Sequence, residues 1–187
     1  MQNDIKKAVQ VLQNGGLILY PTDTIWGIGC DATNPEAVKK VFSLKKRSDS
    51  KSLIILIDNI NHISKYADSV PDIAYDLIEY SEKPVTIIFE KAKNLAKNLI
   101  SIDESIAIRV TKDEFCSRLI SKFNKPIVST SANLSGDKYP QSFLDITPEI
   151  VEKVDYVVEW RQEEISLAQP SSILKLWNSG QIKIIRK

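Results

Sequence analysis

The sequence has few of the residues on which many protein functions depend. Its 187 residues include two cysteines, one histidine and one methionine. Cys30 and Cys116 are far apart and belong to no CxxC or Cys/His arrangement, which argues for reduced thiols and against structural zinc. His62 has no partner in the sequence from which a catalytic triad could be built. A covalent-nucleophile enzyme is therefore disfavoured.

An excess of charge of one sign and long apolar runs are also lacking. The chain carries 25 basic and 24 acidic residues, for a net charge of +1. Non-specific nucleic-acid binders are usually strongly basic, so this balance leaves room only for a local basic site. No apolar run approaches the roughly 20 residues of a membrane span, and residues 1–10 lack the apolar core of a signal peptide. We expect a soluble, cytoplasmic protein without a membrane partner.

Helix-like and strand-like segments alternate along the chain. Residues 3–16 have helical spacing, with Asn3 or Asp4 as a candidate N-cap and Gly15 at the end, and Asn34 before Pro35 predicts another helix start. The full set is helices at 3–16, 34–47, 72–81, 112–123 and 142–154, and strands at 17–20, 52–58, 85–90, 105–110, 126–130, 155–160, 171–176 and 181–187. Alternation predicts one three-layer α/β domain over 1–187, and the consecutive C-terminal strands indicate a mixed sheet.

Two clusters of polar side chains follow predicted strands. The stretch "IVSTSANLSG", 127–136, has more hydroxyl and amide groups than a surface turn needs. In "YPTDTIWGIG", 20–29, Thr22, Asp23 and Thr24 follow a proline and precede Gly27 and Gly29. That segment is either a turn leading into a strand with close glycine contacts, or a place where hydroxyls and amides converge on a small polar ligand.

Basic residues gather after the second predicted helix. Lys45, Lys46, Arg47 and Lys51 either form a solvated helix end that opposes the macrodipole or bind a phosphate group. Neither GxGxxG nor a Walker A motif is present.

Two further arginines lie in strand-like segments. Arg109 and Arg186 would either extend to solvent or bind an anion in a cleft. Hydroxyls, an amide and cations at several strand ends suit the binding and transfer of a phosphorylated compound by positioning and electrostatics.

Three segments together resemble the YrdC family of threonylcarbamoyl-AMP synthases. They are "GGLILYPTDTIWGIGCDA", "LKKRSDSKSLIILI" and "STSANLSG", in the family's order and spacing, and weaker blocks extend the resemblance from Gly15 to Arg186. The resemblance implies the short, single-domain form of a YrdC-like fold, a twisted mixed sheet around a concave, positively charged cavity.

The resemblance also implies a reaction. L-threonine, bicarbonate or carbon dioxide, and ATP would give threonylcarbamoyl-AMP and pyrophosphate, with Mg²⁺ accompanying ATP. The threonine carbamate would attack the α-phosphate directly, so no protein nucleophile is required. A separate tRNA threonylcarbamoyl transferase complex would consume the product.

Matching the motifs residue by residue implies a set of site residues. The KxR motif supplies Lys45 and Arg47 as catalytic residues, and no metal ligand is assigned. The threonine-binding residues would be Thr24, Arg109, Ser131 and Ser171, and the ATP-binding residues Arg47, Lys51, Ser105, Asn133, Gln141 (or its neighbour Ser142) and Arg186.

The sequence departs from the family pattern at several positions. Ser48 and Ser52 stand where prolines are usual, and Thr111 replaces another proline. A histidine on the threonine side has no match, because the position reads Leu56 or a neighbour, and His62 does not replace it.

Two rival functions remain to be weighed. A non-catalytic factor that binds double-stranded RNA or tRNA, or that acts in ribosome maturation, could use the same basic cavity. The related subgroup of uncertain function tends to lose the SxN pair, so Ser131 and Asn133 favour the synthase. A carbamoyl-transfer protein of hydrogenase maturation would carry additional zinc-finger-like cysteine motifs.

The motif assignment predicts that Arg47→Ala abolishes most product formation while the fold stays intact. Loss of one charged phosphate contact should cost ~2–4 kcal/mol of transition-state stabilisation. Turnover of the variant, compared with its melting curve, is the measurement, and near-normal turnover would refute the role.

Overall fold

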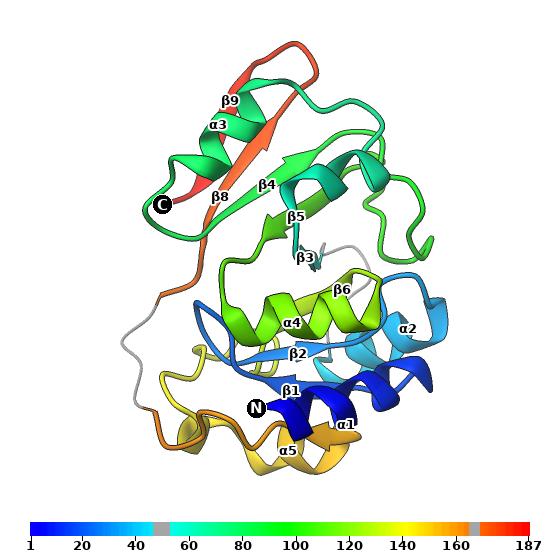
Figure 1. Ribbon diagram of the computed structural model, residues 1–187, viewed down its shortest axis with the longest axis vertical. Coiled ribbons are helices and arrows are strands. Elements are labelled where there is room, and N and C mark those ends of the chain that lie inside the picture. Colours follow the sequence, from blue (N-terminus) through cyan, green and yellow to red (C-terminus); the bar gives the residue numbers. More distant parts are fainter. Residues whose placement is uncertain (47–52, 165–168) are drawn as a thin grey trace.

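The computed structural model describes residues 1–46, 53–164 and 169–187. It is built on one nine-stranded sheet, in which the strands lie in the order β7-β1-β2-β6-β3-β5-β4-β8-β9 (Figure 1). The strands are β1 Ile18–Tyr20, β2 Gly27–Gly29, β3 Ile54–Ile57, β4 Val85–Phe89, β5 Ile106–Val110, β6 Ile127–Ser131, β7 Tyr156–Val157, β8 Ser172–Leu176 and β9 Ile182–Arg186.

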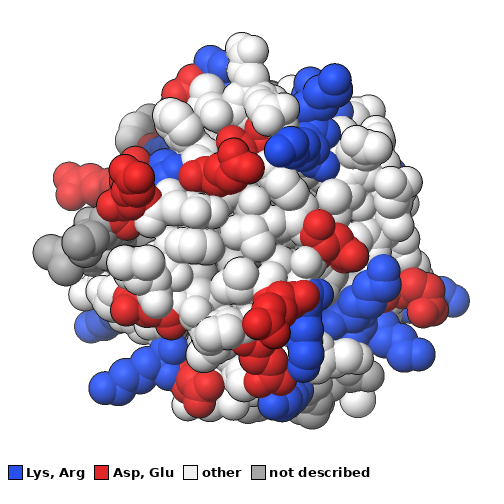
Figure 2. All heavy atoms as spheres, turned by 90° about the horizontal axis from the view of Figure 1, so that it is seen from below, with Lys and Arg blue, Asp and Glu red and all other residues white. Residues whose placement is uncertain are grey.

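The connections between the strands carry the helices. The α-helices are α1 Gln2–Gln13, α2 Pro35–Leu44, α3 Ile73–Glu79, α4 Glu114–Phe123 and α5 Pro148–Lys153, and the 3-10 helices are η1 Ile60–Lys65 and η2 Phe143–Asp145. Within the described ranges, no helix is both long enough and apolar enough to cross a bilayer. On the face drawn in Figure 2, basic and acidic side chains are interspersed.

The sheet is mixed, as the consecutive C-terminal strands indicated. β3 pairs parallel with β5, β4 with β8, and β1 with β7, whereas the other neighbours are antiparallel. β6 joins the two halves because it pairs with β2 on one side and β3 on the other.

Helices cover both faces of the sheet, so the predicted three-layer α/β architecture is confirmed. α1 and α4 pack together against one face, where their apolar residues form a cluster with Ile18, Leu56 and Ile127 (Figure 1). The opposite face forms a larger cluster with α2 and α3, and its strand residues include Ile55 and Val128.

The two-helix layer covers only part of its face. Leu56 of β3 and Ile127 of β6 lie beneath it. Ile54 and Ser129, each two positions along the same strands, point to the same face because side chains alternate along a strand. They line a cavity, and they do not belong to the apolar cluster that α1 and α4 form. The uncovered part of this face is therefore available for a ligand.

Both helix starts that the sequence predicted can be compared with the structure. Asn34 caps α2, and its side chain accepts from the backbone N–H groups of Glu36 and Ala37. The predicted cap of α1 was wrong, because that helix already begins at Gln2. Asp4 lies inside it and accepts instead from the Tyr156 hydroxyl at 2.7 Å, which ties α1 to β7.

The glycines of β2 are required by close packing. A Cβ at Gly29 would lie 2.7 Å from Tyr20 Cε1 and 3.0 Å from the Val128 carbonyl oxygen. At Gly27 the nearest atom would be Ser129 Oγ at 3.3 Å. The sequence-based alternative of a strand with glycines at close approaches is confirmed.

This packing predicts that Gly29→Ala lowers the free energy of unfolding by about 1–3 kcal/mol, the usual cost of overpacking. Gly27→Ala is the matched control, because its contact is with the end of a side chain that can rotate. Urea unfolding of both variants measures the difference. Equal stability of the two would contradict the close approach at Gly29.

Candidate functional site

The uncovered part of the sheet forms the floor of a cavity of about 360 Å³. Its lining comes from β2, β3, β5 and β6, from the loops before β2 and after β6, and from the strand pair β8 and β9. The lining residues that carry polar side chains are Thr24, Arg109, Ser129, Thr130, Ser131, Asn133, Asp137, Lys138, Tyr139, Ser171 and Arg186.

The cavity brings together six of the site residues predicted from sequence. They lie far apart along the chain and meet because β2, β5, β6 and β9 converge here. The six are Thr24, Arg109, Ser131, Asn133, Ser171 and Arg186.

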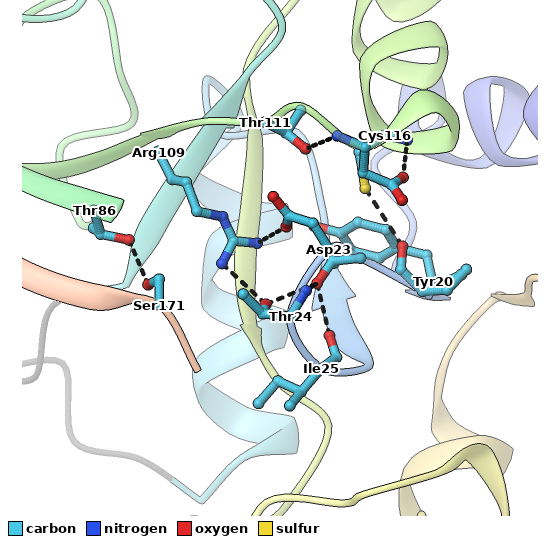
Figure 3. Close-up of polar contacts among 12 residues, drawn as sticks. Tyr20, Asp23, Thr24, Ile25, Thr86, Arg109, Thr111, Cys116 and Ser171 are labelled. Atoms are coloured by element: carbon cyan, nitrogen blue, oxygen red, sulfur yellow. Dashed lines mark hydrogen bonds and ion pairs between the residues drawn. The ribbon is translucent and has the colours of Figure 1, made fainter. Parts of the chain in front are cut away.

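Arg109 is the cation at the floor. It projects from β5 and is 3% exposed. Nη1 donates to Thr24 Oγ1 at 3.0 Å, and Nη2 lies 3.3 Å from Asp23 Oδ1 (Figure 3). Among the described residues, Arg109 Nε has no hydrogen-bond partner. Arg109 also lines the cavity, so its guanidinium can offer an anionic ligand the donors that Thr24 does not occupy.

A short hydrogen-bond chain orients the acceptor of Arg109. Thr22 Oγ1 donates to the Ile25 carbonyl oxygen at 2.9 Å and lies 2.9 Å from Thr24 Oγ1. Because the Thr22 proton is used in this way, Thr24 must donate to Thr22. The Thr24 lone pairs are then directed toward Arg109, which fixes one end of the guanidinium.

A second cation enters the cavity from the edge strand. Arg186 Nε and Nη2 donate to the Ser171 carbonyl oxygen at 3.0 Å and 2.7 Å. Partial burial and the nearby charge of Arg109 lower the pKa of Arg186. Two guanidinium groups that repel each other across one cavity favour an anionic ligand between them.

The Ser171 hydroxyl forms a hydrogen bond with Thr86, a residue that the sequence analysis did not select. Thr86 Oγ1 and Ser171 Oγ are 2.7 Å apart (Figure 3). Thr86 is fully buried in the apolar strand β4. A single hydroxyl in "VTIIF" was the available signal, since buried hydroxyls require a partner.

Lys45 of the KxR motif is a buried connection, not part of the cavity wall. It is 2% exposed, and Nζ donates to the carbonyl oxygens of Ser131 and Asn133, the second at 2.7 Å. Its own carbonyl oxygen accepts from Ser135 N at 3.1 Å. Lys45 therefore fixes the path of the loop that carries the SxN pair. Its predicted catalytic role stays a prediction.

Two predicted ATP residues do not line the cavity. Ser105 Oγ donates to Asp103 Oδ1 at 2.6 Å, and hydrogen bonds from Lys175 and Ser105 lower the pKa of Asp103 to about 2. Gln141 borders a small neighbouring hollow, which shares Thr24, Ile25 and Trp26 with the cavity. Arg47 and Lys51 lie outside the described residues.

Two aromatic residues of the wall were also missed. Trp26 lines the cavity and packs against Phe143 with a centroid separation of 5.0 Å. Tyr139 lines it as well and is 36% exposed. Nothing in the sequence pattern distinguishes either from an ordinary core or loop residue.

The residues that the sequence analysis set aside lie elsewhere. Leu56 is fully buried beneath α1 and α4. His62 Nδ1 is 3.0 Å from Asp58 Oδ1 and borders a different hollow. In the described ranges, no group of three or more histidine, cysteine or acidic residues could hold a metal ion.

Comparison with solved structures supports the fold. P. abyssi Sua5 complexed with L-threonine superposes with a TM-score of 0.83 at 26% identity, covering 92% of this chain and 50% of that one. This chain therefore spans about half the length of that Sua5 protein. E. coli YciO, at 20% identity, shares the fold with a TM-score of 0.86 and covers all of this chain and 90% of that one.

Sequence comparison assigns the family. A threonylcarbamoyl-AMP synthase of Pseudoalteromonas translucida is 37% identical over 161 residues, which cover 84% of this chain and 86% of the relative. The family model described as "Telomere recombination" matches residues 10–187. The predicted resemblance is confirmed, and the chain belongs to the Sua5/YciO/YrdC family.

Proposed function

We propose that this chain is a threonylcarbamoyl-AMP synthase, which joins L-threonine, carbon dioxide and the AMP moiety of ATP and releases pyrophosphate. The enzyme class predicted from the motifs is confirmed by the curated relatives. One observation of the site carries the proposal: two arginines, Arg109 and Arg186, border a single cavity that the hydroxyls of Thr24, Ser131 and Ser171 also line.

The threonine site would lie at the floor of the cavity. Arg109 lines the cavity and presents a planar fork that suits a carboxylate. Thr24, Ser131 and Ser171 supply hydroxyls for the polar groups of the amino acid. P. abyssi Sua5, which shares this fold, was crystallised with L-threonine.

The nucleotide would bind across the same cavity. Arg186 and Asn133 border it, and Arg47 and Lys51 of the motif region would neutralise phosphate charge. Mg²⁺ would accompany ATP and would help to neutralise the phosphate charge during the transfer. We expect Lys45 to act through the loop that it holds.

The chemistry needs no protein nucleophile. The threonine amine adds to carbon dioxide and loses a proton to give a carbamate. A carbamate oxygen then forms a bond to the α-phosphorus while the bond to the β-phosphate oxygen breaks and pyrophosphate leaves. Burial raises the pKa of Cys116 well above its ordinary value, which disfavours a reactive thiolate.

Several finer expectations belong to this proposal. Bicarbonate would be the source of carbon dioxide, a tRNA threonylcarbamoyl transferase complex would take the product, and the protein would work in the cytoplasm. Binding of double-stranded RNA or tRNA without catalysis is the alternative. Both members of the SxN pair are present and line the cavity, which favours the synthase.

The proposal is tested by incubating the protein with L-threonine, bicarbonate, Mg²⁺ and ATP. Mass spectrometry should detect threonylcarbamoyl-AMP together with pyrophosphate. Reactions that lack threonine, or that contain a chelator in place of Mg²⁺, should give none. Tight binding of duplex RNA without any product would favour the alternative.

We predict that Arg109→Lys lowers kcat/KM for L-threonine by roughly 10- to 100-fold, because lysine keeps the charge but loses the bidentate fork. The KM for ATP should change by less than about threefold, since the loss concerns the amino acid. Arg118→Lys, on the exposed face of α4, is the control. An equal decrease in kcat/KM for L-threonine and for ATP would argue against a carboxylate contact at Arg109.

A further inference from the structure

The ion pair behind the cavity floor is incomplete. Asp23 Oδ1 lies 3.3 Å from Arg109 Nη2, close enough for strong attraction. Yet among the described residues Asp23 Oδ1 is a buried atom without a hydrogen-bond partner. The carboxylate thus attracts the guanidinium without taking one of its N–H groups in a well-aligned bond.

Two neighbours contact the Arg109 guanidinium but do not use all of its N–H donors. Thr24 Oγ1 accepts a hydrogen bond from Nη1, and the Asp23 carboxylate attracts Nη2 (Figure 3). An arginine has five N–H donors, and the hydrogen bond to Thr24 occupies one of them. Two neighbours therefore fix the plane of the fork while donors remain for a ligand.

Asp23 stands at the boundary between two hollows. Its side chain is 18% exposed and borders a second hollow of about 190 Å³, which is also lined by Val110 of β5 and by Asp113. Arg109 lines the main cavity and not this one. The Asp23 carboxylate therefore contacts Arg109 from the side of the second hollow. The side of the guanidinium that faces the main cavity stays available to an anion.

We propose that Asp23 is a positioning residue for substrate, which holds Arg109 in the orientation that binds the carboxylate of the amino acid. This rests on the proposed function, because it requires the amino acid to bind at Arg109. Asp23 does not touch the substrate and acts only through Arg109. Its charge matters because Thr24 offers a neutral acceptor, and a buried cation held by neutral groups alone is costly.

The charge of Asp23 could instead weaken substrate binding, since it repels a second carboxylate. Two features favour the positioning role. Arg109 is 3% exposed, so a guanidinium without its anionic neighbour is expected to rotate toward any other acceptor. Asp23 also borders the second hollow, whereas the amino acid would bind in the main cavity. The guanidinium of Arg109 would then lie between the carboxylate of Asp23 and that of the substrate.

The test is calorimetric binding of L-threonine and of L-threoninamide, which lacks the carboxylate. In the unmodified protein the acid should bind at least tenfold more tightly than the amide, because only the acid pairs with Arg109. Asp23→Asn keeps the shape and removes the charge, and it should reduce this preference by roughly tenfold. Asp23→Glu should restore most of the preference.

Asp113→Asn is the matched control. Asp113 pairs with Arg161 Nη1 at 2.8 Å and borders the same hollow, but in the described part of the chain no hydrogen bond or ion pair joins it to Arg109. Asparagine at position 113 can still cap the N-terminus of α4, as Asp113 does. This variant should lose a comparable ion pair and retain the preference for the acid, which separates positioning from general stability.

The two proposals fail in different ways. If the unmodified protein does not prefer L-threonine to its amide, the threonine site at Arg109 is wrong. If it does, and Asp23→Asn keeps the full preference or gains affinity for the acid, the positioning role of Asp23 is wrong. Melting curves of all variants show whether each one is folded.

Discussion

The site depends on how one buried charge is accommodated. Arg109 places a guanidinium at 3% exposure on the floor of the cavity, where an isolated charge would be strongly unfavourable. The protein balances it with one carboxylate and one oriented hydroxyl, from Asp23 and Thr24. This compensation leaves part of the guanidinium unused, and that part can contribute to ligand binding.

The sheet explains why the cavity lies where it does. α1 and α4 cover Leu56 and Ile127, whereas the next residues on the same face, Ile54 and Ser129, line the cavity and are covered by no helix of residues 1–46, 53–164 or 169–187. The same face carries the SxN loop after β6, held by Lys45, and Arg186 from β9. Strand order therefore gathers motifs from the whole chain into one site.

Much of this could be predicted from the sequence. Periodicity located the helices and most strands, and turn and capping chemistry at Asn34 and Gly15 marked boundaries correctly. Motif resemblance selected six residues that do line one cavity, which composition could not do. The cap of α1 was misassigned because Asp4 has a tertiary partner, Tyr156, that local sequence does not reveal.

The lone hydroxyl of Thr86 is visible in the sequence, but its partner, Ser171, depends on which strands become neighbours. The contributions of Trp26 and Tyr139 depend on the tertiary fold in the same way. Lys45 shows the same limit, since its ammonium is directed to loop carbonyls far away in the sequence.

The central claim is that Arg109 receives the carboxylate of L-threonine, and a crystal structure of the complex tests it most directly. We predict the carboxylate within hydrogen-bonding distance of Arg109, with the amino acid in the cavity that Thr24 and Ser131 line. Threonine bound elsewhere, or with its carboxylate away from Arg109, would contradict the account.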